Sequence, residues 1–145
     1  MDREPLHFSL EAGLADLAGI RGQVREYALA CQASAEQADE VELAVDEAAA
    51  NVIRHAYGAK KPARLEITAS CEGGNLVVVV RDYGKVYRPQ KVTQAQLRKI
   101  LAEHTPHGLG RYIMQMCMDD VTYRSRPGKH NETKMVKKLS TRGRS

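Results

Sequence analysis

The sequence predicts an α/β (α+β) two-layer sandwich, in which helices pack on one face of a mixed, mostly antiparallel sheet. Two observations support this prediction. Strand-like and helix-like segments follow one another in the order βααββ, a long loop, then αββ. Most of the strands are close enough in sequence to be joined by hairpins, which build antiparallel sheets. The 145 residues are about right for one domain with one core.

The first part of the chain predicts one strand and two helices. Residues 5–10 are the candidate first strand, and apolar side chains then recur at helical spacing from Leu14 to Cys31. Ser34 is a candidate N-cap for the second helix, with Gln37 as its capping-box partner. The glycine at position 58 ends this helix near residue 57.

The rest of the chain predicts two hairpins separated by a loop and a helix. ARLEITAS and LVVVV read as paired strands joined by the turn EGGN. Residues 85–107 are polar, carry two prolines and hold one short helical patch at 95–102. A segment of this length is usually a lid or a binding loop when it is ordered. A third helix follows Gly108 to Gly110, and residues 121–124 and 133–139 are the closing strands.

Composition excludes several classes of protein. Apolar residues make up 43% and charged residues 28% of the chain, as in soluble globular proteins. No apolar run approaches the roughly 20 residues that span a bilayer, and the N-terminus lacks a signal-peptide core, so no membrane partner is expected. The three cysteines form no CxxC motif, which argues against zinc or disulfides and fits a cytoplasmic location. Much of the basic excess lies at the C-terminus and aromatic residues are few, so direct nucleic-acid binding is not expected.

Two adjacent acids in the second helix take different positions on a helical wheel. With Ala48 at the centre of the apolar face and about 100° per residue, Asp46 lies about 160° away and belongs to solvent. Glu47 and Asn51 lie at about 100° and 60° on one side, one turn apart at the edge of the core. His55 falls nearly on the apolar stripe, which predicts a buried, hydrogen-bonded imidazole.

Glu47 and Asn51 can therefore face a cleft together. An amide oxygen is a hard neutral ligand suited to Mg²⁺, which usually keeps several waters and relies on substrate phosphates. A carboxylate one turn away can accept a proton from an attacking hydroxyl or water. The alanines at 48–50 would let a planar ligand approach the helix closely. Taken alone, such a pair is more often an ordinary surface Glu and Asn on an amphipathic helix.

Two glycine motifs add to this pair. RDYG places Asp82 and Gly84 at the end of a buried strand, where the carboxylate can accept a hydrogen bond from a ligand amine. HGLG places Gly108 and Gly110 before a helix, whose free N–H groups and positive dipole end suit an anion. Each motif is weak alone, because turns after strands and glycines at helix starts are common. Their order within one short domain is more specific.

This order resembles the GHKL (Bergerat-fold, HATPase) superfamily of ATP-binding domains. It is most similar to the small anti-sigma-factor branch, the serine-protein kinases of bacterial stress response and sporulation control. The resemblance extends from about residue 10 to residue 139. The four boxes of the family are matched in order by Glu47 and Asn51, Asp82 and Gly84, Gly108 and Gly110, and Thr133.

The resemblance implies a role for each of these positions. Asp82 would bind the adenine amino group with support from Thr133, and Gly84 would let the base lie close. Asn51 would coordinate a Mg²⁺ ion that bridges the phosphates of ATP. Glu47 would be the catalytic base that activates a serine hydroxyl of a partner protein for attack on the γ-phosphate.

The remaining implied parts are a lid and a phosphate-binding turn. Residues 85–107 would form the ATP lid, and Gly108, Leu109 and Gly110 would offer backbone N–H groups to phosphate. Phosphoryl transfer also calls for a cation at the γ-phosphate, and the sequence leaves four candidates open: Arg98, Lys99, His104 and Arg111. Residues 140–145 are expected to be a flexible tail.

Two positions depart from the family pattern. Val86 stands where many members carry another glycine, although the anti-sigma branch often lacks it. Glu132 stands where some relatives have a glycine before the threonine, which bears on the adenine contact. No phosphoacceptor histidine helix precedes the domain, so the chain does not resemble a complete sensor histidine kinase.

The resemblance therefore implies a cytoplasmic anti-sigma factor, expected as a homodimer, that is also an ATP- and Mg²⁺-dependent serine protein kinase. It would sequester a sigma factor and phosphorylate an anti-anti-sigma (STAS-type) protein. The alternative is a nucleotide-binding regulator that sequesters a partner without kinase activity. A third hypothesis is a GHKL module of an unrelated phospho-signalling pair. The presence of Glu47 favours catalysis.

Overall fold

A computed structural model of the chain describes residues 3–56, 62–86, 93–103 and 109–139. Helices and strands follow one another along the chain in the predicted order. They are β1 (Arg3–Ala12), the short 3₁₀-helix η1 (Leu14–Asp16), α1 (Leu17–Ala30), α2 (Ala35–Asn51), the π-helix η2 (Val52–Ala56), β2 (Ala63–Glu72), β3 (Asn75–Asp82), α3 (Gln94–Glu103), α4 (Leu109–Cys117), β4 (Asp120–Arg126) and β5 (His130–Lys138). The described part of the chain holds no helix long and apolar enough to span a bilayer.

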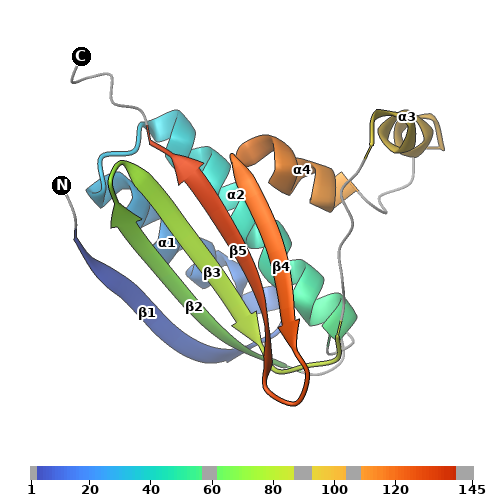
Figure 1. The fold of residues 1–145 in the computed structure, drawn as a ribbon, viewed down its shortest axis with the longest axis horizontal. Helices are drawn as coiled ribbons and strands as arrows, with labels where there is room; N and C mark the ends of the chain where they lie inside the picture. Colours follow the sequence, from blue (N-terminus) through green and yellow to red (C-terminus); the bar gives the residue numbers. More distant parts are fainter. Residues whose placement is uncertain (1–2, 57–61, 87–92, 104–108, 140–145) are drawn as a thin grey trace.

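The strands form one sheet in the order β1-β2-β3-β5-β4, and every described pairing is antiparallel. The described sheet is therefore not mixed, because β2–β3 and β4–β5 are hairpins and β1 and β5 also pair in the opposite direction to their neighbours. Helices α1, α2 and α4 lie on one face of the sheet and leave its other face open (Figure 1). The predicted two-layer α/β sandwich is confirmed.

Strand alternation decides which side chains enter the core between these layers. In β2 and β3 every second residue is buried, including Leu65, Ile67, Val78 and Val80 at 0% exposure. α2 contributes its predicted apolar stripe together with the alanines at 48–50, which are at most 5% exposed. These alanines therefore pack in the core, and the close approach of a planar ligand to this part of the helix stays a prediction.

The start of α2 follows the predicted capping box. The Gln37 backbone N–H donates to Ser34 Oγ at 3.0 Å, and the Ser34 backbone N–H donates to Gln37 Oε1 at 3.0 Å. These two bonds satisfy backbone donors that the first turn of a helix leaves free. They fix the residue at which α2 begins, and so they help to set which of its later side chains face the core.

The end of α2 contradicts the prediction for His55, which is exposed rather than buried. Beyond Asn51 the helix continues as η2, a π-helix. A π-helix closes hydrogen bonds between residues five apart, so its residues no longer advance by the α-helical angle. Val52 and Ile53 are buried as a result, whereas Arg54 and His55 point outward.

Asp46 also differs from its prediction, because α1 packs beside the face that the wheel assigned to solvent. Arg21 on α1 donates to Asp46 Oδ1 at 3.1 Å, and the aspartate side chain is only 22% exposed. A second arginine of α1, Arg25, pairs with Asp39 and Glu42 on α2. Asp46 therefore helps to join two helices, which leaves Glu47 as the acid of this pair that faces α4.

Lys137 on β5 is a charged residue of the core, with 9% exposure. Its ammonium group donates to the backbone carbonyl of Cys117 at 2.6 Å and lies 2.8 Å from Glu40 Oε1. One side chain thus joins the sheet, the last turn of α4 and the first half of α2. A cation at a helix C-terminus is also favoured by the helix dipole.

Replacing Lys137 by methionine should lower the free energy of unfolding by about 1–3 kcal/mol, because a buried carbonyl loses its donor and Glu40 loses its partner. Glu40 is partly exposed, which keeps the effect below that of a fully buried ion pair. Urea unfolding measures the change. Lys134→Met, at an exposed position of the same strand, is the control and should stay within about 0.5 kcal/mol of the wild type. Equal values for the two variants would remove Lys137 from this role.

Candidate active site

Glu47 on α2 and Gly110 in the first turn of α4 are in direct contact. A Cβ atom added to Gly110 would lie 2.2 Å from Glu47 Oε1, far closer than two such atoms can approach. Lys137 meanwhile holds the other end of α4 near Glu40. The two helices therefore run antiparallel. This arrangement places Glu47 of the predicted Glu47–Asn51 motif against Gly110 of the predicted Gly-x-Gly motif.

The environment of Glu47 makes its carboxylate a stronger base than usual. The side chain is partly buried, and this burial is the main reason why the pKa of Glu47 is raised above its ordinary value of 4.5. The charge of Arg54 acts in the opposite direction and lowers the pKa, while Asp46 raises it. A partly buried carboxylate with a raised pKa is a candidate for a catalytic base.

Asn51 lies one turn after Glu47 and carries an unsatisfied group. Its Nδ2 atom is buried and meets no hydrogen-bond partner among the described residues. Leaving a buried donor unpaired costs about 1–3 kcal/mol, so this amide is a candidate for contact with a ligand. Within the described ranges no group of three or more His, Cys, Asp or Glu residues could hold a metal. The unpaired Nδ2 is a donor and suits an acceptor such as a phosphate oxygen, whereas the amide oxygen is the atom of Asn51 whose chemistry suits Mg²⁺.

Asp82 ends β3 as a buried carboxylate, 2% exposed. Its Oδ1 atom accepts hydrogen bonds from the Gly84 backbone N–H at 2.9 Å and from Asn131 Nδ2 at 2.9 Å. Burial raises the pKa of Asp82, and the two hydrogen bonds and the nearby His130 partly offset this rise. The predicted pair Asp82 and Gly84 is therefore joined by a tight turn at the end of a core strand.

Asn131 is a residue of this site that the sequence analysis missed. It lies directly opposite Asp82 in the β3–β5 pairing, whereas the predicted Thr133 lies opposite Val80. Both side chains face the core, at 3% and 5% exposure. Strand alternation from Thr133 would have placed Asn131 on the same face, but only the strand register brings it to Asp82.

The two groups of residues lie toward the same end of the molecule. The last turn of α2 and the end of β3 both point to the lower part of Figure 1, and α2 contacts β3 in the core. Among the predicted residues, the structure shows direct contact between Glu47 and Gly110 on the helical layer, and between Asp82 and Gly84 at the end of β3. Thr133 lies two residues along β5 from Asn131, which pairs with Asp82. An acid with a raised pKa, an unpaired amide and a buried acceptor suit a ligand that has both anionic and hydrogen-bonding parts.

A comparison with protein families identifies the domain. Residues 10–137 match the family described as the histidine kinase-like ATPase domain, which covers most of the chain. The chain belongs to the histidine kinase-like ATPase family. The predicted membership of the GHKL superfamily is confirmed, and so is the predicted class of fold.

Relatives of this histidine kinase-like ATPase domain support the anti-sigma branch. It is 28% identical over 121 residues to an anti-sigma F factor of Thermoanaerobacter pseudethanolicus, covering 83% of this chain and 84% of the relative. It is 29% identical over 105 residues to an anti-sigma F factor of Pasteuria penetrans, covering 72% and 70%. It is also 28% identical over 86 residues to the serine/threonine-protein kinase BtrW of Bordetella bronchiseptica, covering 59% and 61%.

Solved structures share the fold at low sequence identity. The RsbU and RsbW domains of a Mycobacterium tuberculosis protein align with a TM-score of 0.66 at 18% identity. That alignment covers 94% of this chain, which spans only about a third (32%) of the larger protein. A chain of the SiaB–SiaC complex from Pseudomonas aeruginosa aligns with a TM-score of 0.52 at 18% identity, covering 91% of this chain and 88% of that one.

The side chain of Glu132, one of the two departures from the family pattern, lies away from the Asp82 side of this ATPase domain. Asn131 and Thr133 on either side of it face the core, so Glu132 faces the open side of the sheet. There it accepts a hydrogen bond from Arg81 at 2.5 Å, and this contact lowers the pKa of Glu132. The glutamate therefore does not occupy space beside the buried carboxylate.

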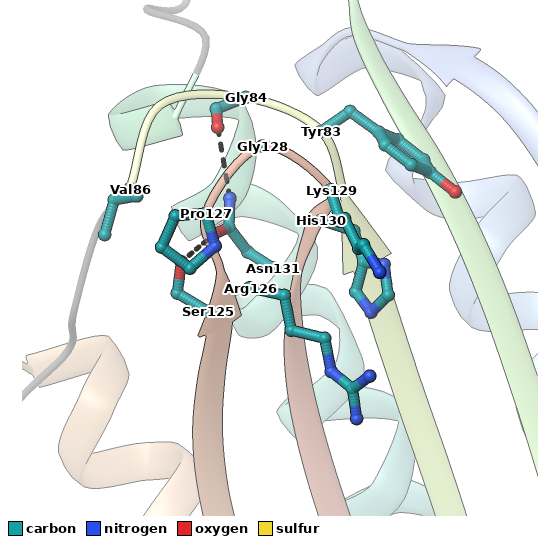
Figure 2. Close-up of a pocket in the computed structure, with 10 residues that line it drawn as sticks. All are labelled: Tyr83, Gly84, Val86, Ser125, Arg126, Pro127, Gly128, Lys129, His130 and Asn131. Carbon is teal, nitrogen blue, oxygen red and sulfur yellow. Dashed lines mark hydrogen bonds between the residues drawn. The ribbon is translucent and has the colours of Figure 1, made fainter.

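A pocket of about 250 Å³ lies at the tip of the β4–β5 hairpin, next to Gly84 and Val86 (Figure 2). Its hairpin side is formed by residues 125–131, which include three basic side chains and no acidic one. The amide of Asn131 separates this pocket from Asp82. The pocket thus borders the residues around the buried carboxylate from the outer end of the sheet.

Several predicted residues lie partly or wholly outside the described ranges. Gly108, His104 and residues 140–145 lie outside the described residues, and for Leu109 and Arg111 the structure describes the backbone only. α4 begins at Leu109, and the phosphate-binding role of this turn stays a prediction. Of the predicted lid, the structure describes residues 85–86 and 93–103, which include α3 with Arg98 and Lys99 exposed on it. The lid and its cation remain predictions.

Proposed function

We propose that this chain is an ATP- and Mg²⁺-dependent serine protein kinase and an anti-sigma factor. It would sequester a sigma factor and phosphorylate a STAS-type anti-anti-sigma protein on a serine. The observation that supports this most strongly is the contact of Glu47 with Gly110, which puts a base at the start of the helix expected to bind phosphate. The names of the relatives, anti-sigma F factor and serine/threonine-protein kinase, point to the same function.

The proposed chemistry uses the chain's own residues as follows. Asp82 accepts a hydrogen bond from the adenine amino group, and the backbone N–H groups at the start of α4 hold phosphate oxygens. Asn51 holds Mg²⁺ through its amide oxygen; the ion, when bound, neutralises charge on the phosphates. Glu47 accepts the proton of the partner's serine hydroxyl as the serine oxygen bonds to the γ-phosphorus, while the bond from that phosphorus to the β,γ-bridging oxygen breaks and ADP leaves.

Titration calorimetry with ATP, in the presence and absence of Mg²⁺, tests the nucleotide part of this proposal. The wild type should bind ATP more tightly when Mg²⁺ is present. Asn51→Ala should still bind ATP without metal but should lose the gain that Mg²⁺ provides. If that variant binds Mg²⁺–ATP as the wild type does, the role of Asn51 is wrong; if the wild type binds neither ATP nor ADP, the proposed function fails.

The pH dependence of phosphoryl transfer should report the ionisation of Glu47. A base must be deprotonated, so kcat at saturating ATP should fall as the pH drops through the raised pKa of Glu47, above the ordinary 4.5. Arg54→Met removes a positive charge, so the fall of kcat should occur at a higher pH than in the wild type. Asp46→Asn removes a negative charge, so the fall should occur at a lower pH. Stopped-flow or quench measurements of kcat across pH decide this, and shifts in the same direction for both variants would exclude Glu47 as the titrating base.

The proposed partners and assembly follow from the family branch. A sigma factor and a STAS-type protein would bind the chain, and a homodimer is expected. Light scattering after size-exclusion chromatography measures the oligomeric state of the chain alone and with each partner.

A further inference from the structure

We propose that Asn131 is a positioning residue that sets the preference of the site for adenine. By holding Oδ1 of Asp82, it leaves Oδ2 of the same carboxylate as the acceptor for the amino group of the base. This inference rests on the proposed nucleotide-binding function, and it concerns a residue outside the four sequence boxes.

The orientation of the Asn131 amide is fixed by its three contacts. Nδ2 donates to Asp82 Oδ1 at 2.9 Å and to the Gly84 carbonyl at 3.1 Å, and Oδ1 accepts from Ser125 Oγ at 2.7 Å. A carbonyl and an ionised carboxylate can only accept hydrogen bonds. The donor Nδ2 of Asn131 must therefore face both the Gly84 carbonyl and the Asp82 carboxylate. At 3% exposure the amide has little freedom to turn.

These contacts also determine what Asp82 can offer a ligand. Oδ1 already accepts two hydrogen bonds, from the Gly84 backbone and from Asn131. Oδ2 accepts no hydrogen bond from the described residues. It is therefore the oxygen that can accept a hydrogen bond from a ligand. Both bonds favour the ionised, acceptor-only form of Asp82, against the effect of its burial.

An acceptor-only oxygen distinguishes two kinds of purine. Adenine carries a 6-amino donor, whereas hypoxanthine carries a 6-oxo acceptor that would face the carboxylate oxygen. A buried polar group that is left unpaired or opposed is the strongest source of discrimination between similar ligands. Loss of Asn131 would let the Asp82 carboxyl rotate or take up a proton, and the site would lose this distinction.

The surroundings make Asn131 accessible to substitution. Ser125 and Asn131 both line the pocket at the hairpin tip (Figure 2), and Asn131 lies at the edge of the core, outside its hydrophobic cluster. His130 is the neighbouring titratable group whose charge acts on Asp82. Leu65 of β2 and Asn131 of β5 flank Asp82 in the sheet, and neither carries a charge.

The test compares the dissociation constants of ATP and ITP by calorimetry at neutral pH. The wild type should prefer ATP by at least about tenfold, or 1.4 kcal/mol. Asn131→Leu, of similar size and without hydrogen bonds, should lower this ratio by at least about tenfold. Asn131→Asp places a second carboxyl against Asp82, so the pair should share a proton and ITP should gain relative to ATP. Lys129→Met, another residue of the pocket, is the control and should keep the ratio.

Each outcome decides between the possible roles. If both Asn131 variants weaken ATP and ITP equally, or lower the melting temperature while the ratio is kept, Asn131 is only structural and the inference is wrong. If one variant does not fold, the other still gives the ratio. If the wild type binds ATP without preference over ITP, the inference fails while the nucleotide site stands. If the wild type binds no nucleotide, the proposed function fails as well.

Discussion

Gly110→Ala should lower kcat for phosphoryl transfer by at least about 100-fold, because small displacements of a catalytic group have effects of this order. The new methyl group would lie 2.2 Å from Glu47 Oε1, so the carboxylate must leave its place at the start of α4. The clashing atom is the tip of a flexible side chain, and alanine favours helix over glycine by about 1 kcal/mol. The free energy of unfolding should therefore change little while activity is lost.

Gly19→Ala is the matched control for this substitution. Gly19 lies in α1 and a Cβ atom there meets nothing within 4 Å. Alanine at this position should keep full activity and stabilise the chain by about 0.5–1 kcal/mol. Measurement of kcat and of urea unfolding for both variants separates the two effects. Full activity in Gly110→Ala would mean that the observed position of the Glu47 carboxylate is not required.

Glu47→Gln should lower kcat by about 10²–10⁴, the usual contribution of a general base. Glutamine keeps the shape of the side chain and removes its ability to take a proton, so the dissociation constant of ATP should change by less than about tenfold. Because the pKa of Glu47 is raised in the folded state, its ionised form opposes folding at neutral pH. The variant should therefore be no less stable than the wild type.

Single-turnover transfer of the γ-phosphate, with calorimetry of ATP binding, checks both parts of this prediction. Glu36→Gln, at an exposed position in the first turn of α2, is the control and should keep full activity. Loss of ATP binding in Glu47→Gln would indicate that this residue holds the nucleotide. An unchanged kcat would exclude it as the base.

Much of the fold could be predicted from local patterns in the sequence. The capping box at Ser34, the glycine turn between β2 and β3, and the alternation in β2 act over a few residues, and all are observed. The prediction failed for His55, because an ideal wheel cannot anticipate the change to a π-helix after Asn51. The prediction that Asp46 faces solvent failed because a helical wheel describes one helix alone. It cannot show that α1 places Arg21 beside this carboxylate.

The candidate site was predictable only as a set of separate motifs. The boxes named Glu47, Asn51, Asp82 and Gly110, and the structure adds the contact of Glu47 with Gly110. Asn131 could not be found in this way, since its role depends on which residue of β3 lies opposite it. Register between distant strands is set by the packing of the whole sheet rather than by any short motif.

The central claim is tested most directly by phosphoryl transfer to a serine. Purified STAS-type proteins of the same genome would each be incubated with the wild-type chain and Mg²⁺–ATP, then analysed by mass spectrometry. One of them should gain a single phosphoserine with wild-type chain and none with Glu47→Gln. If the wild-type chain binds ATP tightly and none of these proteins gains a phosphoryl group, the kinase proposal is contradicted and the chain is a nucleotide-binding regulator.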